Sequence, residues 1–209
     1  MADYAMVIDL DLCIGCNACT VACKVENGTP PKIFYSRVLE LEMGEQPGVL
    51  RLFLPVLCNH CEDAPCVTVC PTKASYMAVD GTVQIDDDKC IGCRSCMVAC
   101  PYHARSYAVK NNYYFGETPI PFTVEPKSGK VGVVQKCDFC TSRRRNGKEP
   151  ACVEACPTRC RIFGSMDNPD DRINELIASE KSFRLLPSAG TRPKVHYLSK
   201  HKGKIAASH

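Results

Sequence analysis

The chain has 209 residues, of which 17 are cysteine, and a formal net charge of +3. This length fits one large domain or two small ones, and the cysteine excess points to disulfides, structural zinc or iron–sulfur clusters. Because few aromatic residues accompany basic stretches, we expect no nucleic-acid partner. The N-terminus MADYAMVIDLDLC lacks the parts of a secretory signal, and the longest apolar run is interrupted by Arg51 and Pro55, so neither a signal nor a membrane span is expected.

Taken in chain order, short β-rich runs alternate with cysteine motifs. Alternation and β-branched content predict strands at residues 5–10, 48–56, 81–86 and 130–136, each just before a motif. Each cysteine loop should lead into a brief helix. Residues 108–130 are rich in turn formers and aromatic residues and are interpreted as an insertion that covers a cluster or a partner.

A further helix is predicted within residues 167–182. Asn168 is expected to cap this helix, with Pro169 in its first turn. Ile173, Leu176 and Ile177 would then line one face. The remaining C-terminal residues predict a short strand and a basic polar tail. Because residues 166–209 contain little apolar sequence of their own, we expect them to lie along another subunit.

One cysteine pattern occurs four times. The first and third copies are C-x2-C-x2-C-x3-C, and the second and fourth have a longer gap before the third cysteine. The four copies are Cys13, Cys16, Cys19 and Cys23; Cys58, Cys61, Cys66 and Cys70; Cys90, Cys93, Cys96 and Cys100; and Cys137, Cys140, Cys152 and Cys156. Cys160 is left over, and we predict that it is not a ligand.

This spacing is typical of 4Fe–4S clusters. Three closely spaced cysteines wrap one corner of a cubane, and the fourth points away to a second cluster, with a proline behind it in three copies. Gly15 and Gly92 are expected to permit close approach of the backbone to the cluster. Structural zinc usually uses paired C-x2-C units, and a disulfide scaffold is disfavoured by such tight spacing. Four oxidised clusters, each contributing −2 with its thiolates, would bring the net charge to about −5.

Crossing fourth ligands imply that the motifs work in pairs. The second and third motifs are neighbours in sequence and should share one unit, which leaves the first and fourth to close around it. We define the four predicted thiol sets accordingly. Set 1 is Cys13, Cys16, Cys19 with Cys156; set 2 is Cys58, Cys61, Cys66 with Cys100; set 3 is Cys90, Cys93, Cys96 with Cys70; and set 4 is Cys137, Cys140, Cys152 with Cys23.

The predicted fold class is α+β, with two ferredoxin-like two-cluster units in one chain, an insertion and an extended C-terminal tail. The inner unit spans residues 58–107 and holds sets 2 and 3. The outer unit combines residues 1–57 and 131–165 and holds sets 1 and 4. The insertion is residues 108–130, and the tail, residues 166–209, is predicted to contact a partner subunit.

Two histidines and an arginine run remain. His60 and His103 lie within or just beyond motif loops, but every set already has four thiols, so a loop or hydrogen-bonding role is favoured over ligation. Arg143, Arg144 and Arg145 fit a solvated loop better than a docking site for an acidic partner. No acid–base pair, activated nucleophile or phosphate loop is recognisable. We therefore predict no catalytic residue and no direct small-molecule substrate.

The four motifs, in this order and with these gaps, resemble the four-cluster electron-transfer (beta) subunit of molybdopterin oxidoreductases. The resemblance runs from about residue 4 to residue 165, and CNHCEDAPC and CVEACPT are its most specific stretches. Among its branches, the polysulfide, thiosulfate, dimethyl sulfoxide, tetrathionate and arsenate reductases are the most similar. All sixteen ligand positions of the family are cysteine here, which implies four 4Fe–4S clusters and no three-iron cluster.

The resemblance also implies partners. It predicts a molybdopterin catalytic subunit and a membrane subunit that oxidises quinol or reduces quinone, with this chain relaying single electrons in anaerobic respiration. The complex would lie at the cytoplasmic membrane, with the periplasmic face favoured through co-export with a partner and the cytoplasmic face left open. Two alternatives are an electron-transfer subunit of a formate dehydrogenase or hydrogenase complex, and a free polyferredoxin.

Overall fold

The computed structural model describes residues 3–44, 47–110 and 131–207. Most of the predicted insertion, including its aromatic residues, therefore lies outside the described residues. The elements are β1 (Tyr4–Asp9), α1 (Ala18–Asn27), β2 (Ser36–Met43), β3 (Leu50–Leu57), α2 (Pro65–Thr68), β4 (Ser75–Met77), β5 (Val83–Ile85), α3 (Ser95–Val98), β6 (Ser106–Tyr107), β7 (Val134–Gln135), α4 (Thr141–Arg145), α5 (Ala151–Glu154), β8 (Arg161–Ser165), α6 (Arg172–Ala178), β9 (Ser182–Phe183), a 3-10 turn η1 (Pro187–Ala189), β10 (Val195–Leu198) and α7 (Lys202–Ala207).

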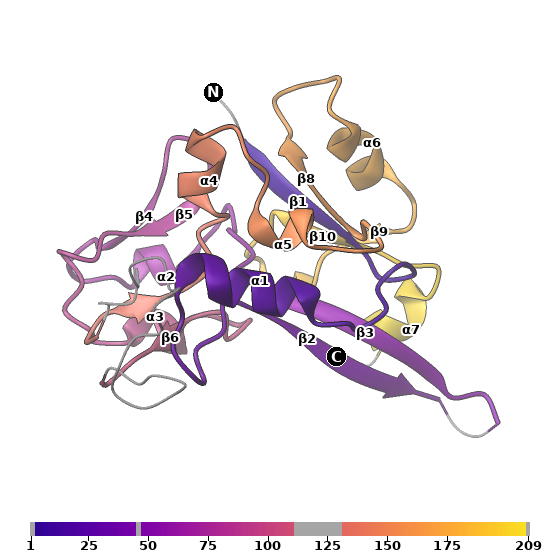
Figure 1. Ribbon diagram of the computed structural model, residues 1–209, viewed down its shortest axis with the longest axis horizontal. Helices are drawn as coiled ribbons and strands as arrows, with labels where there is room; N and C mark the ends of the chain where they lie inside the picture. Colours follow the sequence, from indigo (N-terminus) through magenta and orange to yellow (C-terminus); the bar gives the residue numbers. More distant parts are fainter. Residues whose placement is uncertain (1–2, 45–46, 111–130, 208–209) are drawn as a thin grey trace.

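A four-stranded sheet with the order β8-β1-β10-β9 supports the outer unit (Figure 1). Its strand β1 is buried on both faces, which explains why its sequence is almost wholly apolar. Met6 and Ile8 enter the core that contains cysteines of sets 1, 2 and 4. Ala5 and Val7 point to the opposite face, where Ile173 of α6 covers them. The sheet therefore lies between the core that contains the cysteines and a separate apolar layer.

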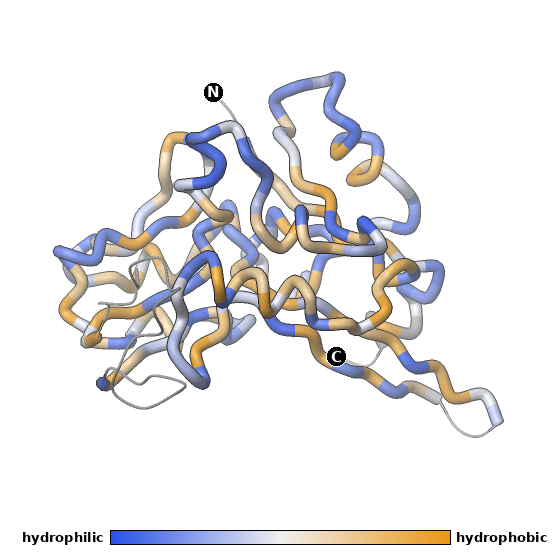
Figure 2. Tube along the Cα trace, in the orientation of Figure 1, coloured by the Kyte–Doolittle hydropathy of each residue, from blue (hydrophilic) through white to orange (hydrophobic). Residues whose placement is uncertain are grey.

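A long antiparallel hairpin, β2–β3, extends beyond the rest of the molecule in Figure 1. Hydrophobic and hydrophilic residues alternate in the second half of β2 and at the start of β3 (Figure 2), because a strand exposes alternate side chains on opposite faces. Leu52 and Leu54 of β3 are buried in the core beside the sheet. The sequence predicted β3, whereas β2, with its charged outward-facing positions, was not predicted.

The inner unit is built from small elements around its own core. The strands β4 and β5 pair with each other, α2 packs against α3, and Val83 and Ala64 are buried with three of the cysteines. The strand β7, predicted as part of the outer unit, pairs instead with β6, and its Val134 lies in the inner core. Mixed helices and short sheets confirm the predicted α+β class.

The C-terminal segment is more integrated than its sequence predicted. The expectation that it has little core of its own was wrong, because β10 pairs in parallel with β1 and all four of its residues are buried. Upstream of β10, the backbone N–H of Lys194 donates to Asn59 O at 2.9 Å. The tail thus binds a loop of the inner unit and then completes the outer sheet. Whether it also contacts another subunit stays a prediction.

The helix α6 begins later than predicted. Its cap is Asp171, whose carboxylate accepts from the backbone N–H of Ile173 at 3.1 Å, whereas Asn168 accepts from Asp170 in the preceding turn. An aspartate directly before the helix competes successfully because it reaches the free N–H groups of the first turn. The apolar face was predicted correctly. Within the described ranges, no helix has both the length and the apolar character needed to cross a bilayer.

Candidate metal centres

Two cavities are each lined by the four thiols of one predicted set. Cys90, Cys93 and Cys96 of set 3 face one cavity together with Cys70, which comes from the end of the α2 segment. Cys13, Cys16 and Cys19 of set 1 face the other cavity together with Cys156, which follows α5. In both cases the structure brings the crossing cysteine to the motif that the sequence paired with it.

The thiols of set 2 lie close enough to influence one another's ionisation. Burial raises the pKa of Cys61 to about 12; a hydrogen bond with Thr191 opposes this rise, and the neighbouring charges of Cys58, Cys66 and Cys100 reinforce it. All four of these cysteines are buried. Because thiolates are the form that binds iron, loading this set requires the release of protons from a buried site.

Set 4 is the most deeply enclosed. Burial raises the pKa of Cys137 well above its usual value, and the charges of Cys23, Cys140 and Cys152 raise it further. Cys23 is influenced in turn by Cys152 and Cys140, so it lies among the thiols of the fourth motif although it belongs to the first. The structure therefore brings together all four predicted sets, and their role as ligands stays a prediction.

The backbone repeats as well as the cysteines. In every motif the residue before the second cysteine has a left-handed conformation: φ is +70° at Gly15, +43° at His60, +67° at Gly92 and +53° at Phe139. Such turns direct successive N–H groups into a concave nest that suits an anionic cluster. A side chain at Gly15 would meet the ring of Phe53, so packing as well as conformation requires glycine there.

A second turn follows the crossing cysteines. Lys73, His103 and Arg159 each come three residues after Cys70, Cys100 and Cys156, and each has a positive φ. Their backbone N–H groups donate to the carbonyls of those cysteines at 3.2 Å in all three cases. His103 is thus a turn residue, as the loop interpretation of the sequence favoured.

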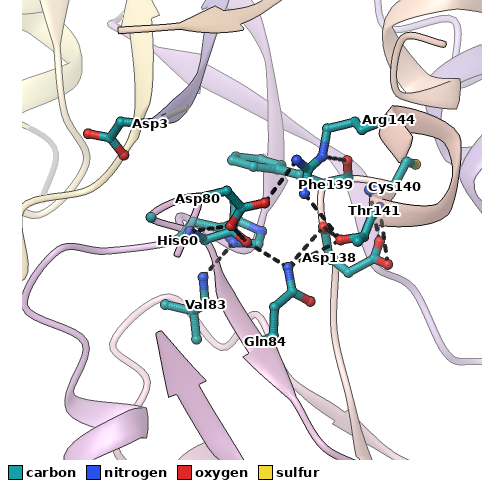
Figure 3. A network of polar contacts seen from close by, with 12 residues as sticks. Asp3, His60, Asp80, Val83, Gln84, Asp138, Phe139, Cys140, Thr141 and Arg144 are labelled. Atoms are coloured by element: carbon teal, nitrogen blue, oxygen red, sulfur yellow. Dashed lines mark hydrogen bonds and ion pairs between the residues drawn. The ribbon is translucent and has the colours of Figure 1, made fainter. Parts of the chain in front are cut away.

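The inner and outer units meet where His60 stacks on Phe139, with ring centroids 3.8 Å apart (Figure 3). These two residues occupy the same position in the second and fourth motifs. Burial, and then the positive charges of Lys136 and Arg144, hold the pKa of His60 well below its usual value. The neutral ring accepts from the backbone N–H of Val83 at 3.1 Å. The stack places sets 2 and 4 on either side of one contact.

Polar contacts surround this stack (Figure 3). Arg144 Nη1 donates to Asp80 Oδ2 at 3.0 Å, and Arg144 Nε donates to Phe139 O at 2.8 Å. Gln84 Nε2 donates to Asp138 O at 3.3 Å. The interpretation of the arginine run as a solvated loop was wrong for Arg144, whose side chain is 7 % exposed. Its guanidinium pairs with Asp80 and so connects the outer unit to the inner unit.

Arg143 is also engaged, because its guanidinium pairs with Glu26 at 3.1 Å and with Glu154. This pair connects α4 to the last turn of α1 and to α5 within the outer unit. Of the three consecutive arginines, Arg145 is exposed, in keeping with the solvated loop that was expected.

Comparison with known proteins shows which family this chain belongs to. A family model for the 4Fe–4S dicluster domain matches residues 49–118 and 117–166, and a 4Fe–4S binding domain model matches residues 4–25. The protein belongs to the 4Fe–4S dicluster family. The two dicluster matches imply four 4Fe–4S clusters, which confirms the predicted cofactors.

Relatives of this 4Fe–4S dicluster protein match it over nearly its full length. A selenate reductase subunit of Mesobacillus selenatarsenatis is 41% identical over 212 residues, covering 94% of this chain and 72% of that protein. A polysulfide reductase chain of Wolinella succinogenes is 39% identical over 205 residues, covering 97% of each. The arsenate respiratory reductase iron–sulfur subunit of Shewanella sp. is 36% identical over 221 residues, covering 92% and 94%.

The residues around the sets fit such clusters. In the described part of the chain, His60 Nε2 and two nitrogens of Arg161, Nε and Nη1, are buried without a protein partner. Buried donors of this kind are costly unless an acceptor is present, and cluster sulfurs are acceptors. No group of three or more His, Cys, Asp or Glu side chains among the described residues is arranged to hold a single metal ion. Four thiols around a cavity are the donor set that a cubane takes.

Sequence reasoning missed two buried arginines beside the sets. Arg105 Nη2 donates to Cys66 Sγ of set 2 at 2.9 Å, and Arg161 lines the cavity of set 1. Burial alone would lower the pKa of Arg161, but the charges of Cys152 and Cys19 outweigh this effect, so the pKa lies above its usual value. The available signal was their common place, five residues after the crossing cysteine.

Cys160 is buried beside a predicted set. It lines the cavity of set 1, with its Sγ 3.4 Å from Cys156 Sγ. Its place in the repeat argues against ligation, because it lies four residues after the crossing cysteine, where the second and third copies have Ala74 and Ala104. Ala74 is buried and Ala104 is partly buried, whereas the first copy has Asn27 at this offset. The prediction that Cys160 is not a ligand stands as a prediction.

Proposed function

We propose that this chain is the electron-transfer subunit of a respiratory molybdopterin reductase, relaying single electrons between a membrane quinol-side subunit and a molybdopterin catalytic subunit. The relatives named above are subunits of selenate, polysulfide and arsenate reductases. In this role the chain has no catalytic residue of its own. Each bound 4Fe–4S cluster supplies one-electron oxidation and reduction, and the protein supplies position, insulation and charge.

The observation that carries this proposal is the pattern of burial across the four sets. All eight cysteines of sets 2 and 4 are buried. Sets 1 and 3 each include one exposed cysteine, Cys16 and Cys93. A relay between two partners needs two accessible ends and an insulated middle, and the order set 1, set 4, set 2, set 3 has this form.

The protein connects the two middle sets through its own packing. His60 and Phe139 belong to the loops of sets 2 and 4, and their stacked rings exclude water from the boundary between the units. Short separation matters most for electron transfer, so a tight aromatic contact at the boundary is where loosening would slow the relay. His60, which carries no charge, keeps the field at this boundary constant.

The two accessible ends are proposed to dock the two partners. Near Cys16 in the sequence, Ile14 is 59% exposed, and near Cys93, Ile91 is 68% exposed. Exposed apolar residues next to a redox centre suit a dry contact that shortens the path to the next centre. We propose the membrane-associated assembly inferred from the sequence, with the periplasmic face favoured.

The test uses the complex purified anaerobically from its native source. We expect this chain to co-elute with a molybdenum-containing subunit, with about sixteen iron atoms per chain. Ile14→Glu and Ile91→Glu should each weaken the association with a different partner. Val79→Glu is the matched control, because Val79 is 86% exposed and lies away from both cavities. Elution as an active monomer near 23.0 kDa would instead indicate a free polyferredoxin.

A further inference from the structure

Two arginines repeat with the cysteines. Arg105 lies five residues after the crossing Cys100, and Arg161 lies five residues after the crossing Cys156. At the same offset from Cys70, the chain has Ser75, whose hydroxyl accepts from Arg105 Nη1 at 2.7 Å. The inner and outer units therefore each carry one arginine at an equivalent position, although their surroundings are different.

In the inner unit, Arg105 lies between the two thiol sets. Its side chain is buried, with 5% of the residue exposed. Nη2 donates to Cys66 Sγ of set 2 at 2.9 Å, and the same residue lines the cavity formed by set 3. The guanidinium is thus within reach of both sets of its unit.

In the outer unit, Arg161 has the matching place. It is 2% exposed, it lines the cavity of set 1, and it lies beside Cys152 of set 4. Nη2 donates to Ser36 Oγ at 3.0 Å. Its Nε and Nη1 have no partner among the described residues, so donors remain available to acceptors within the cavity.

A buried guanidinium requires negative charge nearby. In the described part of the chain, neutral serines and thiols, not carboxylates, are the side chains that accept hydrogen bonds from these two guanidinium groups. An isolated buried cation is strongly unfavourable. The presence of a buried guanidinium in each unit therefore indicates that an anionic group, the cluster with its thiolates, lies beside it when the cofactors are bound. Arginine suits such a position because it stays protonated and presents several donors in a fixed plane.

We propose that Arg105 and Arg161 are positioning residues for electron transfer, each holding a fixed positive charge between the two sets of its unit to stabilise the reduced state of both. The inference rests on the proposed function. Each electron received from the quinol-side partner adds one negative charge to a unit, and the same electron leaves to the catalytic partner. No proton moves in this step, because the guanidinium remains protonated throughout.

The experiment is an anaerobic EPR-monitored redox titration of the complex carrying Arg105→Gln or Arg161→Gln. We expect Arg105→Gln to lower the two inner potentials and Arg161→Gln to lower the two outer ones. The shift should correspond to a roughly tenfold loss in the equilibrium constant for reduction, about 59 mV for a one-electron couple. Arg145→Gln, which removes an equal charge from an exposed position, should leave all four potentials in place.

Iron content separates the two levels of the proposal. Fewer than four clusters in the unmodified complex would contradict the proposed function itself. With four clusters loaded, unchanged potentials in both glutamine variants, or equal shifts of all four, would overturn the role of the arginines.

The lysine variants decide the matter if a glutamine variant fails to load. Arg105→Lys and Arg161→Lys keep the charge but lose the paired donors, so we expect full loading with potentials near those of the unmodified chain. Failure of the lysine variants to load, or potentials lowered as far as in a loaded glutamine variant, would mean that hydrogen-bond geometry and not charge is required.

Discussion

The inner and outer units hold the same cysteine pattern by different means. In the inner unit, α2 packs against α3 and nearly all the elements come from one continuous stretch, residues 58–107. In the outer unit, α1 of the first motif packs against α5 of the fourth motif. The four-stranded sheet of this unit includes β10 from the C-terminal segment. The inner unit is therefore held by local contacts and the outer unit by contacts between distant parts of the chain. Non-local contacts form late and are lost together when one partner strand is removed.

The strongest way to break this comparison is to remove β10. Truncation after Lys194 deletes a strand that lies between β1 and β9, and every residue of that strand is buried. It retains Thr191 and Arg192, whose carbonyls accept from the loop of the second motif. We expect the outer unit to lose both clusters and the inner unit to keep its two, so iron should fall to about half of sixteen atoms.

A shorter truncation is the control. Removal of residues 202–209 deletes α7 and the buried Ile205 but leaves β10 in place. We expect reduced stability with four clusters retained. If the longer truncation also keeps four clusters, the outer unit does not depend on the C-terminal strand, and the contrast between the units fails.

The next largest effect concerns one cluster of the outer unit. Cys156→Ala removes the crossing thiol of set 1, so we expect loss or conversion of that cluster and a fall of one to four iron atoms from about sixteen. Cys160→Ala should leave iron content unchanged, because alanine already occupies this position at Ala74 and Ala104. Mössbauer and iron analysis of both proteins checks this. Loss of a cluster in Cys160→Ala, with Cys156 intact, would show that the ligands of set 1 were assigned wrongly.

The difference between the units also explains what the sequence could predict. Motif spacing is local, so the four flanking strands and the brief helices followed from neighbouring residues. The pairing of the first motif with the fourth is not local and was inferred only after the second and third motifs had been paired. The pairing of Met6 with Val195 is not local, and nothing in the run VHYL distinguishes a sheet centre from a short edge strand. His60, Phe139, Arg105 and Arg161 were within reach, because each repeats at a fixed offset from a cysteine.

Acid should destabilise the β10 region of the outer unit, because His196 lies in β10. Arg184 Nε donates to His196 Nε2 at 3.3 Å, so Nδ1 carries the proton and donates to Ser182 Oγ at 3.3 Å. Burial, and then the charge of Arg184, lower the pKa of His196 from 6.5 to about 4. Between pH 6.5 and about 4, His196 is therefore protonated in the unfolded chain but neutral in the folded chain. The contribution of neutral His196 to the free energy of unfolding is complete above pH 6.5 and is lost as the pH falls toward 4. Its size is about 3 kcal/mol.

The measurement is the denaturant midpoint at pH 7 and at pH 5 under anaerobic conditions. His196→Gln keeps a neutral polar side chain, so its stability should change less between the two pH values than that of the unmodified chain. An equal loss of stability in both proteins would exclude His196 as the group responsible. Exchange of the β10 amides in both proteins would report the local loosening of this strand.

The smallest predicted effect concerns an ion pair between the inner and outer units. Asp80 and Arg144 pair across their boundary at 3.0 Å, with side chains 23% and 7% exposed. Arg144 also lies over the ring of Tyr4 at 4.3 Å, so its replacement removes more than an ion pair. A double-mutant cycle with Asp80→Asn and Arg144→Gln isolates the pair from these other losses. We expect a coupling of about 1 kcal/mol in the free energy of unfolding, the upper range for partly exposed pairs.

The consequence of that coupling depends on how independent the units are. If local contacts suffice for the inner unit, weakening the boundary should separate a single unfolding transition into two, with the outer clusters lost at the lower denaturant concentration. Visible absorbance reports cluster loss, and EPR identifies which pair remains. A single transition in the double variant would mean that the remaining contacts across the boundary, which include the His60–Phe139 stack and the hydrogen bond from Gln84 to Asp138, keep the units together. Phe139→Leu in the same background would then produce the separation, because it removes the stacked ring while retaining a buried aliphatic side chain.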